Sequence, residues 1–359
     1  MDNNSNQVVD NAETDTTIAP VRYDITSYGA DYDVEGIVKR IQRGDIWIPE
    51  FQRSYVWKLT EASRFIESLL LGLPVPGVFF AREADTGTFL VIDGQQRLRT
   101  LQFFYEGYFN PRPDEKTRRV FALTSVQKRF EGRTYQTLDE RDRLRLDNSI
   151  IHATIVRQEA PPDEDTSMYH IFERLNSAGR VLGSQEMRCA IYHGPLIEEI
   201  KFLNRNTTWR NIFGKESTRL KDQELILRFL ALYYNAPRYQ RPMEEFLNKF
   251  ASEHRNADDS FLRDCRSLFT ETIDIVWNGV GRKAFRLGRA LNAAVFDSVM
   301  VGLARRLRRL GSVDPESFAH AYETLLSDPE YVQAVSRSTA DEAFVFLRLD
   351  KAIASFAEI

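Results

Sequence analysis

The chain has 359 residues, of which 43% are apolar and 28% charged, and its formal net charge is -4. These values are typical of a globular protein with a sizeable core, and the length allows two or three domains. The charge excludes a simple polycation, and two cysteines without a CxxC pair exclude a disulfide framework or a cysteine zinc site. We therefore expect a protein of a reducing compartment, the cytoplasm.

The N-terminus has the composition of a disordered tail. Residues 1–20 are rich in Asn, Asp and Thr and contain no apolar core, so they do not resemble a signal peptide. No apolar run in the rest of the chain is long enough to span a membrane. We expect ordered structure to begin near residue 21 and no association with a membrane.

The next part of the chain mixes helical and strand patterns. Apolar residues at helical spacing predict two helices that end at Gly44 and Gly72, the second with Thr60 as its N-cap. Short apolar and β-branched runs bounded by turn residues predict strands. The predicted helices cover residues 34–41, 62–70 and 98–108. The predicted strands cover residues 46–48, 78–81 and 88–92, with further candidates at 118–123 and 150–156.

Helical spacing dominates from about residue 163 to the end of the chain. We therefore expect an all-helical second half. The predicted fold class is α+β, with an α+β domain over residues 21–160 followed by a helical domain over residues 161–359.

A buried strand runs directly into a helix at Asp93-Gly94. Such a junction leaves the first backbone amides of the helix without helical acceptors, and both these donors and the helix dipole favour an anion. Gly94 lets a ligand approach, Gln95 and Gln96 donate and accept hydrogen bonds, and the guanidinium of Arg97 suits a phosphate. Asp93 is a candidate to hold Mg²⁺, a ribose hydroxyl or Arg97. The plainer alternative is that Asp93 caps a solvated first turn.

Several segments in the correct order resemble the DUF262 family, which forms the N-terminal part of GmrSD-type, modification-dependent restriction enzymes and related phage-defence proteins. The first three are Ile48-Pro49-Glu50-Phe51-Gln52-Arg53-Ser54-Tyr55-Val56-Trp57, Ile66-Glu67-Ser68-Leu69-Leu70-Leu71-Gly72-Leu73-Pro74-Val75-Pro76 and Val91-Ile92-Asp93-Gly94-Gln95-Gln96-Arg97-Leu98. Two later stretches are Phe172-Glu173-Arg174-Leu175-Asn176-Ser177 and Gln185-Glu186-Met187-Arg188.

The resemblance implies a ParB/sulfiredoxin-like fold whose strand–turn–helix grips nucleotide phosphates. Relatives with Asp-Gly-Gln-Gln-Arg couple nucleotide hydrolysis to DNA sensing or cleavage. The sequence departs from the family pattern at Arg99, where a small hydroxylated residue is usual, and at Ala178, which replaces the first of two glycines. Carried over by position, the catalytic candidates are Asp93, Gln95, Gln96 and Arg97. The nucleotide-binding candidates are Gly94, Gln52, Arg53, Arg174 and Asn176.

A second cluster of candidates is basic. Residues 281–310 contain eight cations against Asp297 alone, and their apolar middle predicts a buried helix pair with a basic face. Such a face suits a DNA backbone. The alternative is a solvated helix surface with cations near helix C-termini. The DNA-binding candidates are Arg282, Lys283, Arg286, Arg289, Arg305, Arg306, Arg308 and Arg309.

The remaining polar patterns favour structural roles. No two of the five histidines have metal-ligand spacing, so we assign no metal-binding residue, and His254-Arg255-Asn256 lacks the context of an HNH nuclease. Glu186 and Arg188 point to different sides of a helix, where structural pairing is expected. Tyr55 and Trp57, beside Gln52 and Arg53, are candidates for base stacking. The alternative is that Phe51, Val56 and Trp57 belong to the core and Arg53 forms a salt bridge.

Three functional hypotheses follow. The first is an enzyme that hydrolyses a nucleoside triphosphate with Mg²⁺ and engages DNA through its helical domain. The second is a DNA or modified-DNA sensor that works with a separate nuclease or another defence protein. The third is a metal-dependent nickase that acts through Asp93. The sequence leaves the nucleotide, the partner and a homo-oligomeric state open.

Overall fold

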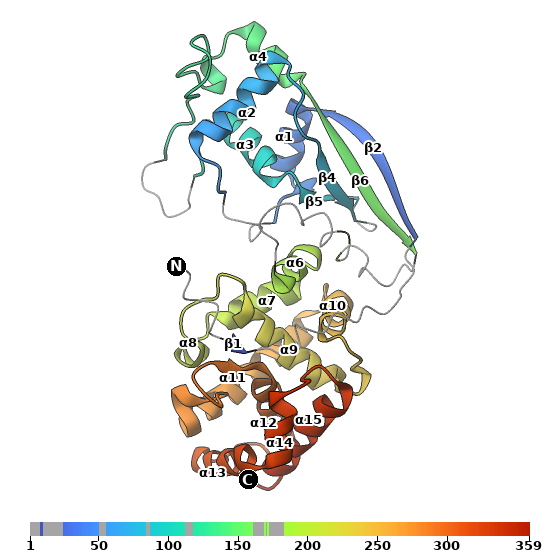
Figure 1. Ribbon diagram of the computed structural model, residues 1–359, viewed down its shortest axis with the longest axis vertical. Helices are drawn as coiled ribbons and strands as arrows, with labels where there is room; N and C mark the ends of the chain where they lie inside the picture. The colour runs from blue at the N-terminus through green and yellow to red at the C-terminus, as the bar shows by residue number, and fades with distance from the viewer. Residues whose placement is uncertain are drawn as a thin grey trace. The chain divides into compact units, whose positions relative to one another are not determined.

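The computed structural model describes residues 8–9, 24–49, 55–83, 87–111, 118–160, 169, 171 and 183–359 (Figure 1). The chain divides into two compact units, residues 22–182 and residues 1–21 with 183–359. We call the first the sheet unit and the second the helical unit. The predicted domain limits differ from this division in residues 161–182, of which the structure describes only Tyr169 and Ile171, so these limits stay predictions.

The sheet unit contains a five-stranded mixed sheet with the strand order β2-β6-β4-β5-β3. The pairs β2·β6 and β4·β5 are antiparallel, whereas β4·β6 and β3·β5 are parallel. The strands are β2 (Asp24–Asp33), β3 (Ile46–Trp47), β4 (Val78–Arg82), β5 (Phe89–Asp93) and β6 (Ile150–Ala160).

Helices cover one face of this sheet (Figure 1). Apolar side chains of the helices and of β4, β5 and β6 form one buried cluster, which includes Val38, Ile66, Leu101, Val91 and Ile155. Their helical or alternating spacing places these residues on one side of each element. The helices are α1 (Val34–Arg43), α2 (Leu59–Leu71), α3 (Gln95–Glu106) and α4 (Glu140–Asp147).

Most of the predicted elements of this unit are confirmed, with two corrections. Gly44 and Gly72 end α1 and α2 in the left-handed conformation, with φ of 82° and 72°. The N-cap of α2 is Lys58, two residues before the predicted Thr60, and the Glu61 carboxylate accepts the Lys58 amide at 2.7 Å. Residues 118–123 form no strand; Val120 makes only an isolated bridge.

The helical unit is built from helices and one very short pair of strands, so the expectation of an all-helical second half is almost met. Strand β1 (Val8–Val9) pairs in parallel with β7 (Leu291–Asn292), and these two tail residues are therefore not disordered. No helix of the described residues is long and apolar enough to cross a membrane. The helices are α6 (Ser184–Ile191), α7 (Pro195–Asn204), α8 (Thr207–Phe213), α9 (Lys221–Asn235), α10 (Met243–Glu253), α11 (Asp259–Val280), α12 (Ala293–Leu310), α13 (Pro315–Ser327), α14 (Pro329–Ser336) and α15 (Glu342–Phe356).

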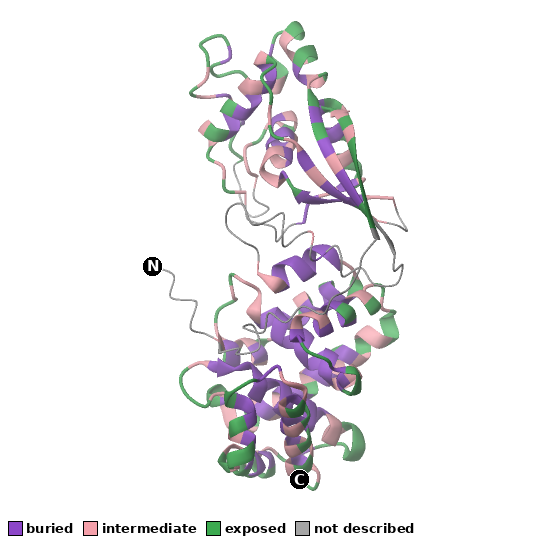
Figure 2. Ribbon diagram, turned by 45° about the vertical axis from the view of Figure 1, so that its right-hand side comes forward, coloured by how far each residue is buried: buried purple, intermediate pink, exposed green. Residues whose placement is uncertain are grey.

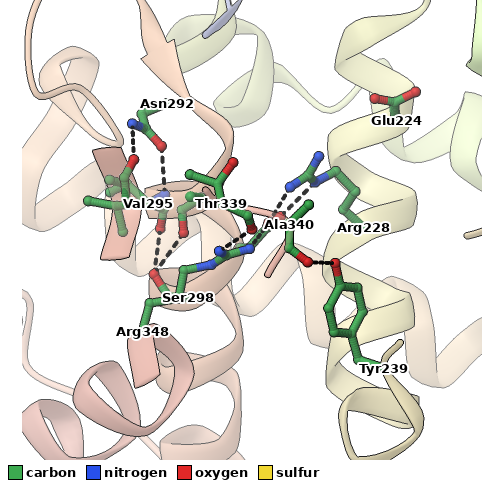
Figure 3. A network of polar contacts seen from close by, with 12 residues as sticks. Glu224, Arg228, Tyr239, Asn292, Val295, Ser298, Thr339, Ala340 and Arg348 are labelled. Carbon is green, nitrogen blue, oxygen red and sulfur yellow. Dashed lines mark hydrogen bonds and ion pairs between the residues drawn. The ribbon is translucent and has the colours of Figure 1, made fainter. Parts of the chain in front are cut away.

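Buried ion pairs join the central helices of this unit (Figure 3). The Asp297 carboxylate on α12 accepts two hydrogen bonds from Arg228 on α9, at 3.1 and 2.7 Å. Arg348 on α15 donates to the same carboxylate at 3.3 Å and to the Thr339 carbonyl at 2.6 Å. All three charged side chains are 0 or 1% exposed. One carboxylate thus holds two guanidinium groups in the core, and Figure 2 shows how much of the centre of this unit is buried.

Candidate functional site

The strand-to-helix junction forms as predicted. Strand β5 ends at Asp93, Gly94 adopts a left-handed φ of 98°, and α3 begins at Gln95. The Leu98 amide donates to the Gly94 carbonyl at 3.0 Å. No side chain caps α3. The N-terminal end of α3 therefore keeps the partial positive charge that attracts anions.

Gly94 is required by the fold itself. A Cβ at this position would lie 2.5 Å from Cγ1 of Val78, closer than side-chain carbons approach one another. The positive φ adds backbone strain for any other residue. The glycine thus lets α3 begin directly against strand β4, in addition to any space that it leaves for a ligand.

Arg97 and Asp93 form an ion pair across the first turn of α3. The Nη2 atom of Arg97 lies 3.1 Å from Oδ2 of Asp93 and donates to the Gly77 carbonyl at 2.9 Å. The Arg97 side chain is 17% exposed and that of Asp93 52%. The Nε atom of Arg97 is buried and has no partner among the described residues. Asp93 therefore orients Arg97, one of the roles expected for it, and does not cap the helix.

Gln96 points to a segment far away in the sequence. Its Oε1 atom accepts the amides of Val56 at 3.0 Å and Trp57 at 3.3 Å. Its Nε2 atom is buried and has no partner among the described residues. Gln95 lies beside it in the first turn and is partly exposed. The two glutamines of the motif thus have different surroundings.

The aromatic residues before α2 pack against α3 and α2. The Tyr55 ring meets Phe103 and Phe109 edge to face, and its hydroxyl lies 2.7 Å from the Thr100 hydroxyl. Burial raises the pKa of Tyr55 to about 12, and the hydrogen bond with Thr100 opposes this shift. Trp57 packs on Phe65. These contacts favour packing roles for both rings over base stacking, whereas Val56, also expected in the core, is exposed.

The other nucleotide-binding candidates lie outside the described residues. They are Gln52, Arg53, Arg174 and Asn176. Sequence reasoning did not single out Gly77 and Thr100, which contact Arg97 and Tyr55. For Thr100 the sequence held one signal: it lies four residues after Gln96, which places both residues on the same face of the helix.

The eight basic candidates lie in two groups at the two ends of α12. The helix has 18 residues and is therefore about 27 Å long. The group at its C-terminal end binds groups of the protein itself: Arg306 donates to the Ile359 carbonyl, Arg309 to the Ala357 carbonyl, and Arg308 pairs with Asp264. Arg305 beside them is partly buried.

In the group before α12, Arg286 donates to the carbonyls of Arg282, Ala284 and Ile212. The alternative of cations near a helix C-terminus therefore describes the group at the end of α12, and DNA binding by the eight residues stays a prediction. Arg282, Lys283 and Arg289 are exposed, and their side chains make no hydrogen bond or ion pair in the part of the chain that the structure describes.

Glu186 and Arg188 have the structural pairing that the sequence predicted. Arg188 is 2% exposed and donates to Glu224 on α9 at 2.9 Å and to Asn248 on α10 at 2.8 Å. Glu186 pairs with Arg219 at 2.9 Å. Helix α6 is therefore an integral part of the helical unit.

The described residues contain no group of three or more His, Cys, Asp or Glu side chains that could hold a metal ion. His254 stacks on Phe261 with a ring separation of 4.5 Å, and burial, opposed by Glu253, lowers its pKa. His254 therefore packs within the helical unit.

Comparison with known families confirms the resemblance. Residues 34–193 match the family described as the GmrSD restriction endonuclease N-terminal domain. The matched segment begins with α1 and ends just after α6, so it contains the β5–α3 junction and reaches into the helical unit. No curated protein matches the chain significantly. A domain of this kind indicates a protein of a restriction system in phage defence.

Proposed function

Because residues 34–193 belong to the GmrSD restriction endonuclease N-terminal domain family, we propose that the chain binds and hydrolyses a nucleoside triphosphate at the start of α3 and engages DNA in phage defence. We also propose that the sheet unit has a fold related to that of ParB and sulfiredoxin. A mixed sheet with helices on one face and a Gly-Arg junction after a central strand supports that relationship.

The observation that carries the proposal is the uncapped N-terminus of α3 with a guanidinium and a carboxylate beside it. The helix end and Arg97 both favour the charge of a phosphate. The Asp93 carboxylate and the Gly77 carbonyl hold the guanidinium in one orientation before a ligand arrives, which is how electrostatic stabilisation becomes effective. A phosphate oxygen that reached the buried Nε would recover about 1–3 kcal/mol of unpaired-donor cost.

Mg²⁺ fits this site as part of the nucleotide complex. Asp93 supplies one exposed carboxylate, and Mg²⁺ is usually held by one or two carboxylates together with substrate phosphates and water. When bound, the ion would neutralise charge on the phosphates. Asp93 would hold it, Arg97 would bind a phosphate, and Gln95 would contact the nucleotide or the attacking water.

Release of inorganic phosphate from purified protein tests the proposal. We expect turnover of at least one nucleoside triphosphate and its loss in Arg97→Ala. The matched control is Arg43→Ala, because Arg43 forms a comparable short-range pair with Asp45 on an exposed surface. Equal turnover in Arg97→Ala and the wild type, or no turnover with any nucleotide, would refute the assignment.

One observation favours a second candidate, a DNA or modified-DNA sensor that works with a separate nuclease. Arg97 already has two partners within the protein, and a guanidinium held in one orientation suits recognition of a DNA phosphate as well as of a nucleotide. A sensor would bind DNA in a salt-dependent way without any effect of nucleotide. A nickase through Asp93 has less support, since the described residues contain no group of three or more His, Cys, Asp or Glu side chains that could hold a metal ion.

A further inference from the structure

Helix α3 holds both flanks of one segment of the chain. The Gln96 side chain accepts the Val56 and Trp57 amides at 3.0 and 3.3 Å. Nearly one turn later, Nη2 of Arg99 donates to the Ile48 carbonyl at 3.2 Å. Residues three apart in a helix lie on the same face. The chain on either side of residues 49–54 is therefore attached to the same face of α3, the helix that follows Asp93 and carries Arg97 in its first turn.

Tyr55 strengthens the attachment of the second flank. Its hydroxyl lies 2.7 Å from that of Thr100, which in turn donates to the Gln96 carbonyl at 2.7 Å. Its ring packs edge to face on Phe103. Residues 55–58 belong to no helix or strand, so the Gln96 oxygen supplies the acceptor that a regular element would give the Val56 and Trp57 amides.

The acceptor capacity of the Gln96 carboxamide oxygen is already used. An amide oxygen has two lone pairs, and two backbone amides occupy them here. If a ligand or a water displaced them, both amides would lose their acceptor. The two residues therefore differ in their capacity to bind a ligand. The Gln96 oxygen is fully used, whereas Nε of Arg97 has no partner among the described residues.

We propose that Gln96 is a positioning residue, which fixes residues 55–57 against the first turn of α3 and so sets the shape of the site formed by Asp93 and Arg97. Its effect on turnover rests on the proposed function, whereas its effect on residues 55–57 does not. The two parts are therefore tested by separate measurements.

Hydrogen exchange of the full-length protein tests the structural part. In Gln96→Leu, which has a similar size but no acceptor, we expect the Val56 and Trp57 amides to exchange about tenfold faster or more. In Gln96→Glu, which keeps an acceptor oxygen, we expect protection to remain. Gln102→Leu is the matched control, since among the described residues Gln102 bonds Arg99 and Glu106, both on α3 itself. Unchanged exchange in Gln96→Leu, or equal loss in Gln96→Glu, would overturn the proposal.

Steady-state phosphate release tests the functional part. The charge of Gln96→Glu is expected to raise KM, but kcat should remain close to that of the wild type because the segment stays in place. Gln96→Leu is expected to lower kcat about tenfold or more, because a small misplacement of reacting groups is costly. A Gln96→Glu variant with protected amides but without turnover would show that Gln96 touches the ligand. A wild-type protein without turnover would refute the proposed function and leave the exchange result standing.

Discussion

The Nη2 atom of Arg97 lies 3.1 Å from Oδ2 of Asp93, one turn earlier in the chain. The pair connects a residue at the end of strand β5 with a residue in the first turn of α3, across Gly94. It gives the guanidinium a fixed direction and leaves the carboxylate half exposed. The two residues are thus coupled, and a change in one is expected to alter the other.

Arg97→Lys tests whether the site needs the planar guanidinium group with its several N–H donors or only a positive charge. A lysine keeps the charge but cannot contact Gly77, Asp93 and a phosphate together, so we expect phosphate release to fall about 10²–10³-fold. Asp93→Asn should also lower turnover, because it removes the charge that orients Arg97 and that would hold Mg²⁺. Phosphate release across a Mg²⁺ titration measures both variants. Full activity in Arg97→Lys would show that a point charge is enough.

Gly94→Ala should destabilise the sheet unit more than Gly44→Ala. Both positions have positive φ, of 98° and 82°, which costs about 1–3 kcal/mol for another residue. Only at Gly94 would the new Cβ overlap Val78, whereas nothing lies within 4 Å at Gly44. Overpacking adds about 1–3 kcal/mol. Urea unfolding measures the difference. Adding Val78→Ala to Gly94→Ala should restore the part of the free energy of unfolding that was lost to the overlap, but not the part lost to backbone strain.

Asp297→Asn should destabilise the helical unit by about 3–5 kcal/mol. The substitution leaves Arg228 and Arg348 fully buried without a carboxylate. Glu358→Gln is the control, since its pair with Arg309 is exposed and such pairs contribute about 1 kcal/mol or less. Chemical denaturation of the two variants checks the ranking, and a similar loss in both would contradict the proposed importance of burial.

Glu224 should make the stability of the helical unit depend on pH. Burial alone would raise its pKa, but Arg188, with Lys221 and Arg228, outweighs burial and lowers the pKa from 4.5 to about 2. A carboxyl group with a lowered folded-state pKa adds stability above its unfolded-state pKa, and this contribution is lost as the pH falls from about 5 towards 2. The free energy of unfolding of wild type relative to Glu224→Gln should therefore shrink over this window. A difference independent of pH would contradict the assignment.

The exposed basic residues before α12 are the ones expected to contact DNA. Replacing Arg282, Lys283 and Arg289 with alanine should weaken DNA binding and reduce the slope of log affinity against log salt by about 3. Arg308→Ala should leave that slope unchanged, because Arg308 pairs with Asp264. Fluorescence anisotropy over a salt series measures both. An equal slope for the triple variant and the wild type would exclude this surface.

Local patterns were enough to predict many elements of the sheet unit. The apolar runs at β4 and β5 and the glycines at the ends of α1 and α2 act through neighbouring residues, so the sequence shows them directly. Strand β2 was not predicted, because most of its side chains are exposed and it lacks an apolar alternation. Its place at the edge of the sheet depends on pairing with β6, more than a hundred residues later.

The sequence by itself determined the Asp93-Gly94 junction and placed Arg97 one turn after Asp93, because both follow from helix geometry within a few residues. Only the tertiary structure decided that Gln96 accepts amides 39 and 40 positions away and that the Arg97 guanidinium meets Gly77. It also decided that Arg306, Arg308 and Arg309 contact the protein itself. The reason is that a side chain's partner is set by which distant segments pack beside it, and the residue type alone does not contain that information.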